Sequence, residues 1–429
     1  MRRSPGMHSG LQNWMLAFLL LLGAFLWQRT AFPLWMVDIF PQQLGAYFYK
    51  HGQAEWMYTP VHLNAEWVAH RAPVATQLGA EGDPNTFLYP PFVAAMLSPV
   101  CEAPATLWRN VLFGINVFLI FVIAYQILLL TTFQRNGRAY FWALALVLLC
   151  YPLARATKLG QIVPLLSALT WMGLLAMRRE RVILAGVTLG FVSAVKIFPL
   201  ALLLLPLFGK RYKLTGVWLG TVAAIYGTAL VTMGLPVHLY WWEVMREFSG
   251  LVQPFFGNQA PLGWFVRLFY HRGWIEVVPF TTPLLDTLRL VSLGVFLGLT
   301  VIVLWTIRYR IFGREFALAA GLLLSGVHLA LPVMWEHYWV FVLPTLGWAI
   351  HDAWQKRDSR FWNVWLAVAA FFFLMKLTHF YGDSTVGEIL SGSQMWGMLL
   401  LWVWFLRRAL LTATSVDIAG KVTARESIS

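Results

Sequence analysis

The stretch GFVSAVKIFPLALLLLPLF, residues 190–208, holds one lysine in an otherwise apolar run, and Pro199 follows that lysine closely. The whole run, residues 182–208, is at least as long as the roughly 17–25 residues that one membrane-spanning helix needs. An ionisable side chain at membrane depth is costly and is a functional candidate by default. Whether Lys196 lies within one span or at a turn between two helices decides the topology of everything that follows it.

The composition indicates an all-α polytopic membrane protein. Of the 429 residues, 59% are hydrophobic and 12% are charged, whereas soluble domains carry about 25% charged residues. Many apolar runs are long enough to span a bilayer, and short basic clusters separate them, which a very apolar soluble core does not explain. The first run, residues 12–28, is interpreted as a retained span or signal anchor because no small-residue cleavage site follows it.

The basic clusters set the predicted topology. If all of them are placed inside, the inside carries 20 Lys and Arg against 6 Asp and Glu, and the outside carries 12 against 13. This asymmetry is the positive-inside pattern of membrane proteins. It accounts for the net charge of +13, so we expect no nucleic-acid partner.

We therefore predict a bundle of about 12 transmembrane or short membrane helices with both termini in the cytoplasm. Residues 1–410 are expected to form a single integral membrane domain with outer loops at 29–104 and 234–286, followed by a cytoplasmic tail, 411–429. The predicted segments are 12–28, 105–131, 140–153, 161–177, 182–195, 197–208, 215–233, 287–308, 315–332, 339–351, 361–378 and 394–410.

The charge rule favours two short helices over one span in residues 182–208. A single span would invert everything downstream, where the inside clusters hold 13 Lys and Arg against 5 outside. Each leg is too short to cross at about 1.5 Å per residue. Residues 140–153 and 161–177 form a similar pair, separated by RATKLGQ. Short helices at that depth line cavities, so we expect a hydrated cavity at the outer face, although the one-span alternative stays open.

Polar side chains from distant parts of the chain fall at the predicted outer ends of the helices. Each has an ordinary interpretation as well, such as a turn at Gln161, a snorkelling Lys196 or an interfacial His337. The case for function rests on the whole set, because polar groups at that depth mark functional sites. The set comprises Asp38, Tyr89, Lys158, Gln161, Lys196, Asn258, Gln259, Glu336, His337 and Tyr338.

A carboxylate, a cation and a histidine at an outer cavity fit glycosyl transfer from a lipid-phosphate sugar. A fixed lysine can balance the charge that develops on a departing phosphate. A carboxylate can take the proton of the attacking hydroxyl. Amide and aromatic side chains can hold sugar hydroxyls and ring faces.

Several short motifs occur in a fixed order between about Asp38 and Pro344. An early Asp is followed by YFYKHGQAEWMY, YPP, GQIVPLL, VKIFPLALLLLP, GNQAPLGWF and WEHYWVFVLP. In this order and spacing they resemble the polyprenol-phosphate-dependent glycosyltransferases of the GT-C superfamily, in particular glycosyltransferase family 87. That family includes α-1,2-mannosyltransferases of mycobacterial lipoglycans.

The resemblance implies a GT-C-type bundle and assigns roles to single residues. Asp38 is expected to be the general base on the acceptor hydroxyl, Lys196 to face the donor phosphate, and His337 to lie near the phosphate or the acceptor. The expected substrate-binding residues are Tyr89, Lys158, Gln161, Asn258, Gln259, Glu336 and Tyr338.

The implied reaction is inverting hexosyl transfer, with mannose expected, from a polyprenyl-phosphate donor to a lipid or glycan acceptor. We expect it at the extracytoplasmic side of a bacterial plasma membrane. No cofactor or metal is expected, because a monophosphate donor has no diphosphate to bridge. Arabinose, glucose and galactose stay open, as do the acceptor, the linkage and the oligomeric state.

Three other functions compete with this one. A transporter or flippase of lipid-linked sugars would also use broken helices, but no polar cluster marks the inner face. An oligosaccharide ligase would favour several arginines in the large outer loop, where Arg246, Arg267 and Arg272 stand. A membrane scaffold without chemistry is the third. Geometry separates these options, because a transferase needs Asp38, Lys196 and His337 around one cavity.

Overall fold

The computed structural model describes residues 5–58, 65–80, 87–131, 137–250, 254–269, 283–356, 358–375, 377 and 384–426. Within these ranges the chain is helical and contains no β-strand, and one isolated antiparallel bridge joins Asn258 to Trp335. The predicted all-α class is confirmed. Parts of the expected outer loops and of the tail, together with Arg272, lie outside the described residues.

The chain divides into two compact units, each built from three stretches. Unit 1 comprises Met1–Gly173, Val187–Ile197 and Trp218–Leu251, and unit 2 comprises Leu174–Gly186, Phe198–Val217 and Val252–Ser429. Three helices contribute residues to both units, namely α8 (Val163–Arg178), α9 (Val182–Val195) and α11 (Tyr212–Met233).

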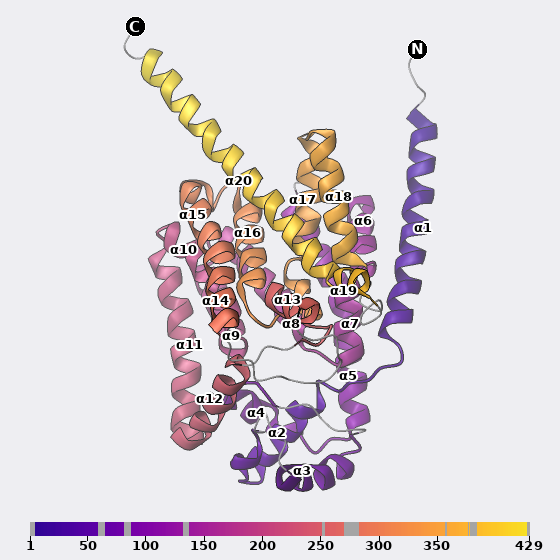
Figure 1. The fold of residues 1–429 in the computed structure, drawn as a ribbon, viewed down its shortest axis with the longest axis vertical. Helices are drawn as coiled ribbons and strands as arrows, with labels where there is room; N and C mark the ends of the chain where they lie inside the picture. The colour runs from indigo at the N-terminus through magenta and orange to yellow at the C-terminus, as the bar shows by residue number, and fades with distance from the viewer. Residues whose placement is uncertain are drawn as a thin grey trace. The chain divides into compact units, whose positions relative to one another are not determined.

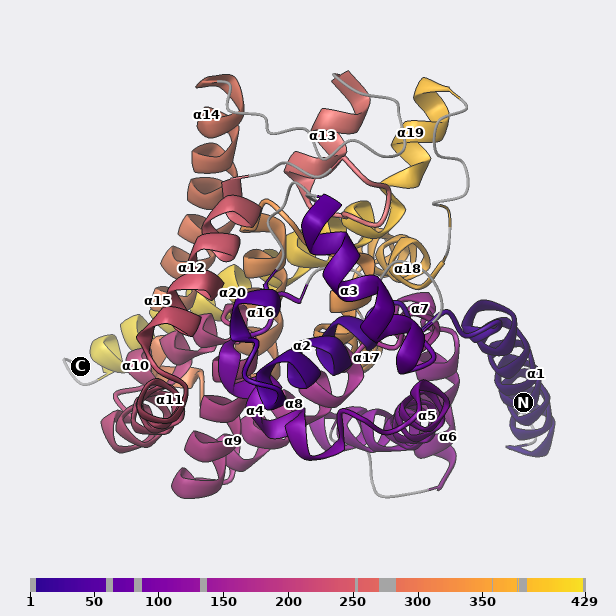
Figure 2. The same ribbon diagram turned by 90° about the horizontal axis from the view of Figure 1, so that it is seen from below.

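Most helices of unit 1 come from the first half of the chain. In it α1 packs on α6 and α7, α5 packs on α6 (Figure 1), and α2 lies beside α4 (Figure 2). Its remaining elements are α1 (Pro5–Ala31), α2 (Phe40–Lys50), η1 (Ala54–Trp56), α3 (Ala65–Gln77), α4 (Pro91–Leu97), η2 (Ser98–Val100), α5 (Ala105–Leu130), α6 (Gly137–Leu148), α7 (Tyr151–Leu159) and α12 (Leu235–Gly250).

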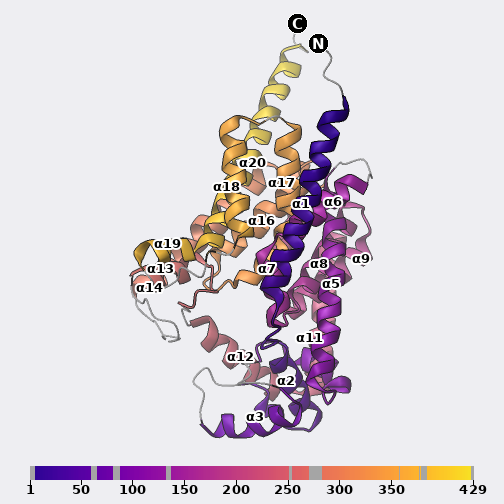
Figure 3. The ribbon, with the colours of Figure 1, turned by 90° about the vertical axis from the view of Figure 1, so that its right-hand side faces the viewer.

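Unit 2 is organised around its longest helix, α20 (Ser393–Glu426), which packs on α16 and α18, while α13 lies against α19 (Figure 3). A Cβ atom at Gly397 would lie 2.9 Å from the Ala369 carbonyl oxygen, so only glycine permits this close approach of α20 to α18. The other elements are η3 (Phe198–Leu203), α10 (Leu204–Phe208), α13 (Pro261–Phe269), α14 (Pro283–Ser292), η4 (Leu293–Gly298), α15 (Leu299–Thr306), η5 (Arg308–Arg310), α16 (Phe316–Ala330), η6 (Glu336–Phe341), α17 (Leu343–Gln355), α18 (Arg360–Leu374) and α19 (Thr385–Ser391).

Five helical stretches of the described chain are long and apolar enough to cross a membrane, and the bent pair α6–α7 makes a sixth if it is one span. Each of the five overlaps a predicted span. The other predicted segments correspond to shorter helices, so the count of about 12 membrane helices stays a prediction. The five stretches are Gly10–Ala31, Ala105–Leu130, Tyr212–Met233, Pro283–Thr306 and Ser393–Ala413.

The run 182–208 breaks at Lys196, as the sequence predicts. Helix α9 ends at Val195, and η3 begins at Phe198. Pro199 contributes to the break, because it has no backbone N–H to donate to the Val195 carbonyl and so does not continue the α-helical hydrogen bonds of α9. The hairpin of two short helices across the membrane stays a prediction.

The stretch RATKLGQ, in contrast, is mostly helical, and its expected role as a connection is wrong. Helix α7 includes its first five residues and ends at Leu159. Gly160 caps the helix, and its φ of +73° is the left-handed conformation that glycine adopts readily. The bend lies earlier, between α6 and α7, where the axes differ by 59°. Pro152 at the start of α7 accounts for it, since proline fits the first helical turn but not a helix interior.

Segments that the charge rule places on one side of the membrane contact one another within each unit. In unit 2, Arg407 forms a bidentate ion pair with Asp358 at 3.0 Å, and Arg211 contacts Glu180 at 2.9 Å. In unit 1, Arg138 donates a hydrogen bond to Gln12 at 2.8 Å. These contacts agree with a common side for the clusters they join.

Candidate active site

Asp38 lies in a tight turn between α1 and α2, and the backbone of this turn is bound to the end of α7. The amides of Trp35 and Met36 donate to the Lys158 carbonyl at 2.9 and 3.0 Å, and the Asp38 amide donates to the Leu159 carbonyl at 2.9 Å. The last carbonyls of a helix lack partners within the helix. The end of α7 therefore fixes the position of Asp38.

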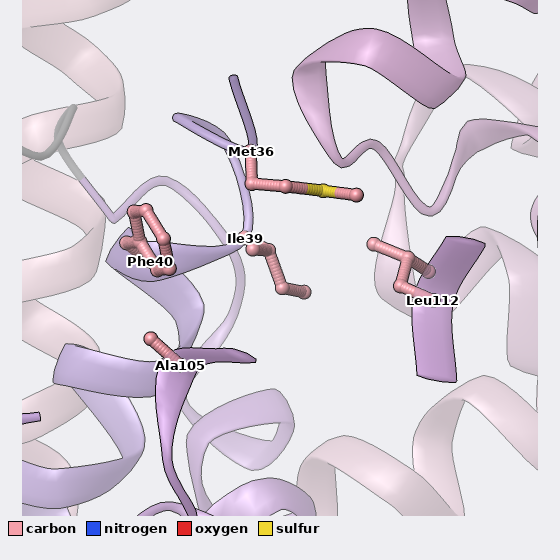
Figure 4. Close-up of a cluster of buried hydrophobic side chains, with 5 residues drawn as sticks. All are labelled: Met36, Ile39, Phe40, Ala105 and Leu112. Atoms are coloured by element: carbon pink, nitrogen blue, oxygen red, sulfur yellow. The ribbon is translucent and has the colours of Figure 1, made fainter. Parts of the chain in front are cut away.

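Apolar side chains on both sides of Asp38 anchor the turn. Met36, Ile39 and Phe40 are buried in one cluster with Ala105 and Leu112 of α5 (Figure 4). Asp38 itself is only half-buried. The buried neighbours thus fix the position of the Asp38 backbone, while the carboxylate itself stays partly exposed.

Gly160 allows the turn to approach α7. A Cβ atom at this glycine would lie 2.7 Å from the Met36 sulfur and 3.1 Å from the Met36 Cα atom. We expect Gly160→Ala to lower stability by about 1–2 kcal/mol through left-handed strain and to lower activity about tenfold by displacing Asp38. Thermal unfolding and initial rates test this.

Gly52→Ala is the matched control for Gly160→Ala. Gly52 also has a positive φ, +69°, but nothing lies within 4 Å of an added Cβ atom. The Gly52→Ala variant should therefore lose stability through the same backbone strain but keep its activity. Equal activity losses in the two variants would contradict the steric explanation.

Gln161 brings an amide directly to the Asp38 carboxylate. Its Nε2 donates to Asp38 Oδ2 at 2.7 Å, and Gln161 is 9% exposed. The backbone carbonyl of Gln161 in turn accepts a 3.4 Å hydrogen bond from Asn116, which is fully buried in α5. An amide donor of this kind orients a carboxylate and leaves its remaining lone pairs able to accept other protons.

Lys196 lies in the break between α9 and η3, outside the candidate membrane spans, and interacts with both Tyr89 and Asp38. Its Nζ is 5.0 Å from the centroid of the Tyr89 ring, within the range of a cation–π interaction. Burial lowers the pKa of Lys196 to about 7, and the Asp38 carboxylate opposes this by stabilising the ammonium.

Lys158 joins the same region from α7. Its Nζ lies 4.0 Å from the centroid of the Trp35 ring, and the Arg155 guanidinium lies 5.0 Å from the same ring centroid. Trp35 is 49% exposed. The turn that carries Asp38 is thus flanked by an aromatic ring with two cations.

The other five predicted site residues belong to unit 2, in two neighbouring segments. The Gln259 amide donates to the Met334 carbonyl at 2.7 Å, and the Glu336 amide donates to the Gly257 carbonyl at 2.8 Å. Glu336 and His337 are 2% and 4% exposed, respectively. The structure therefore brings Asn258 and Gln259 to the segment of Glu336, His337 and Tyr338.

Within unit 1, Gln161 contacts Asp38, and Lys196 lies beside Tyr89 and under the electrostatic influence of Asp38. That these residues form a substrate site stays a prediction. The convergence of His337 with Asp38 and Lys196, and the hydrated cavity, stay predictions. Sequence reasoning missed two residues of unit 1. Asn116 donates a hydrogen bond to the Gln161 carbonyl. Its position as an isolated amide in an apolar span was the sequence feature that could have identified it. Tyr58, whose hydroxyl donates to the Tyr89 carbonyl at 3.0 Å, gave no such signal.

Comparisons with known proteins identify a family for this chain. The family model of glycosyltransferase family 87 matches residues 87–332, more than half of the chain. A curated relative from Mycolicibacterium smegmatis is 26% identical over 296 residues, and the match covers 66% of this chain and 66% of the relative, just under two thirds of its length. The relative is a polyprenol-phosphate-mannose-dependent alpha-(1-2)-phosphatidylinositol pentamannoside mannosyltransferase.

Proposed function

Because this chain belongs to glycosyltransferase family 87, we propose that it transfers a hexose from a polyprenyl-phosphate donor to a lipid or glycan acceptor, with Asp38 as the general base. The arrangement of Asp38, Gln161 and Lys196 in unit 1 carries the proposal. It supplies an oriented carboxylate for a hydroxyl proton and a cation for a phosphate. Mannose is the proposed sugar, because the relative is named for that donor.

The proposed step is a single displacement with inversion. The acceptor oxygen forms a bond to the anomeric carbon while the bond from that carbon to the phosphate oxygen breaks. The hydroxyl proton passes to Asp38, and the polyprenyl phosphate leaves with the electron pair. Lys196 stabilises the charge that grows on the phosphate, because a preorganised cation in a poorly solvated site is far more effective than one in water.

The surrounding residues complete the proposed site. Gln161 orients the Asp38 carboxylate, and Tyr89 places the Lys196 ammonium over its ring. Lys158 is proposed to contact substrate, as are Glu336 and Tyr338 of unit 2, with His337 near the phosphate or the acceptor. The active site is proposed to face the extracytoplasmic side of a bacterial plasma membrane.

The decisive experiment is transfer by the purified protein. We expect radiolabel to move from polyprenyl-phosphate mannose to a membrane-lipid acceptor, with glucose and galactose donors tested in parallel. EDTA should leave the rate unchanged, because a monophosphate donor offers no diphosphate for a metal to bridge. Labelled donor that crosses vesicle membranes without transfer would instead indicate a flippase, and transfer only from a lipid diphosphate would indicate a ligase.

A further inference from the structure

Two adjacent amide side chains in unit 2 tie together three stretches of chain that are far apart in sequence. Asn258 and Gln259 precede α13, and both are fully buried. Asn258 reaches toward residues 332–334, whereas Gln259 reaches toward residues 391–395. We define the amide clip as this pair with its hydrogen-bond partners.

Asn258 holds the segment that leads into η6. Its Oδ1 accepts hydrogen bonds from the amides of Ala260 at 3.1 Å and Met334 at 2.9 Å, and its Nδ2 donates to the Pro332 carbonyl at 3.4 Å. The antiparallel bridge between Asn258 and Trp335 continues this contact along the backbone. Both ends of the amide are therefore engaged by main-chain groups.

Gln259 holds the beginning of α20. Its Nε2 donates to the carbonyls of Phe256 at 2.7 Å and Ser391 at 3.0 Å, and its Oε1 accepts from the Met395 amide at 3.2 Å. A helix N-terminus has amides without intrahelical partners, and Gln259 satisfies one of them.

A buried ion pair between Arg267 and Glu388 stabilises the loop that carries the amide clip. Arg267 of α13 donates from one terminal nitrogen to the carbonyls of Phe255 at 3.0 Å and Asn258 at 2.7 Å. Its Nε lies 3.7 Å from Glu388 Oε2, and both side chains are fully buried. Breaking such a pair from one side is strongly destabilising, so this ion pair fixes the loop of the clip.

We propose that Asn258 and Gln259 are positioning residues, which hold Glu336 and His337 in place for the reaction and do not themselves bind sugar. The inference rests on the proposed function. Its physical basis is that an amide whose donor and acceptor already serve buried main-chain groups can turn to a sugar hydroxyl only by leaving those groups unsatisfied, which costs free energy.

The test combines hydrogen–deuterium exchange with kinetics on the purified full chain. Asn258→Ala should speed exchange in residues 334–341 about 10- to 100-fold, because the hydrogen bond to the Met334 amide is lost. The kcat value should fall about tenfold or more with the KM values of donor and acceptor unchanged. Gln259→Ala should speed exchange at the start of α20 in the same way.

Gln126→Ala is the matched control. It removes a buried amide hydrogen bond of 2.7 Å to the Ala168 carbonyl in unit 1, so it should leave exchange in residues 334–341 unchanged. If Asn258→Ala does not fold, Asn258→Asp serves in its place. It keeps the acceptor for Met334 but loses the donor to Pro332, so a smaller increase in exchange is expected.

A higher KM for the donor or acceptor with unchanged kcat and unchanged exchange would overturn the proposal and indicate direct sugar binding. The exchange measurement does not need turnover. If no sugar donor supports transfer by the unaltered protein, the proposed function fails while the exchange result still reports whether the clip holds the segment of His337.

Discussion

Asp38→Asn is expected to lower the rate of sugar transfer by about 10²- to 10⁴-fold, the usual contribution of a general base. The asparagine side chain has nearly the same shape, and its oxygen can still accept the 2.7 Å hydrogen bond from Gln161. The structure of the turn should therefore persist while the capacity to take a proton is lost. Initial rates with saturating donor and acceptor measure the effect.

Asp286→Asn is the matched control for Asp38. Asp286 is exposed and forms an i,i+3 ion pair with Arg289 on α14, and exposed pairs contribute little to stability. Its rate should equal that of the unaltered protein. Full activity of Asp38→Asn, with normal expression, would remove Asp38 from the reaction and with it the central part of the proposed mechanism.

Lys196→Met is expected to lower kcat/KM by about 10²- to 10³-fold, because it removes a fixed charge from the departing phosphate. Lys50→Met is the control, since Lys50 forms a partly exposed pair with Glu102 at 2.7 Å. Unchanged kcat/KM in Lys196→Met, measured with the polyprenyl-phosphate donor, would show that the ammonium does not face the phosphate.

The pH dependence of kcat/KM tests independently whether the Lys196 ammonium is needed for the reaction. Burial lowers its pKa to about 7, so the free enzyme carries the ammonium below that pH and loses it as the pH rises. The kcat/KM value, which reports the free enzyme, should fall on the alkaline side of about pH 7. Bound phosphate stabilises the ammonium, so the corresponding fall in kcat should occur at higher pH.

Lys196→Arg separates this titration from others. Arginine stays charged throughout this range, so the variant should lose the alkaline fall even if its absolute rate is lower. An alkaline fall that persists unchanged in Lys196→Arg would assign the titration to a different group.

The fold was predictable where local chemistry decides it. A long, mostly apolar run predicts α5, and the lysine followed by proline predicts the end of α9, because neither feature depends on distant partners. The RATKLGQ stretch was misassigned because its polar residues resembled a connection. In the fold Arg155 is buried and lies beside Trp35. Trp35 is about 120 residues earlier in the chain, so no local sequence pattern predicts this contact.

The sequence selects the candidate site as a set of residues, but it does not predict the contacts that those residues make. Asp38, Gln161 and Lys196 stood out because polar groups are rare at membrane depth. The same rule selected Asn258 and Gln259, whose amides bond to main-chain groups in residues 332–334 and 391–395. A sequence shows that an amide is present, whereas its partner is set by tertiary structure, so the rule does not distinguish a ligand-binding amide from a supporting one.

The arginine pairs at the helix ends have a consequence for biogenesis. In the predicted topology each positive charge helps to orient the helix beside it during insertion, and for that purpose lysine serves as well as arginine. In the folded chain Arg407 has a second role. Its planar guanidinium binds Asp358 through two parallel hydrogen bonds, and an ammonium group does not reproduce this geometry. The charge rule and the fold therefore both involve Arg407: its charge contributes to the predicted orientation of the chain, and its planar group joins α20 to the residues before α18.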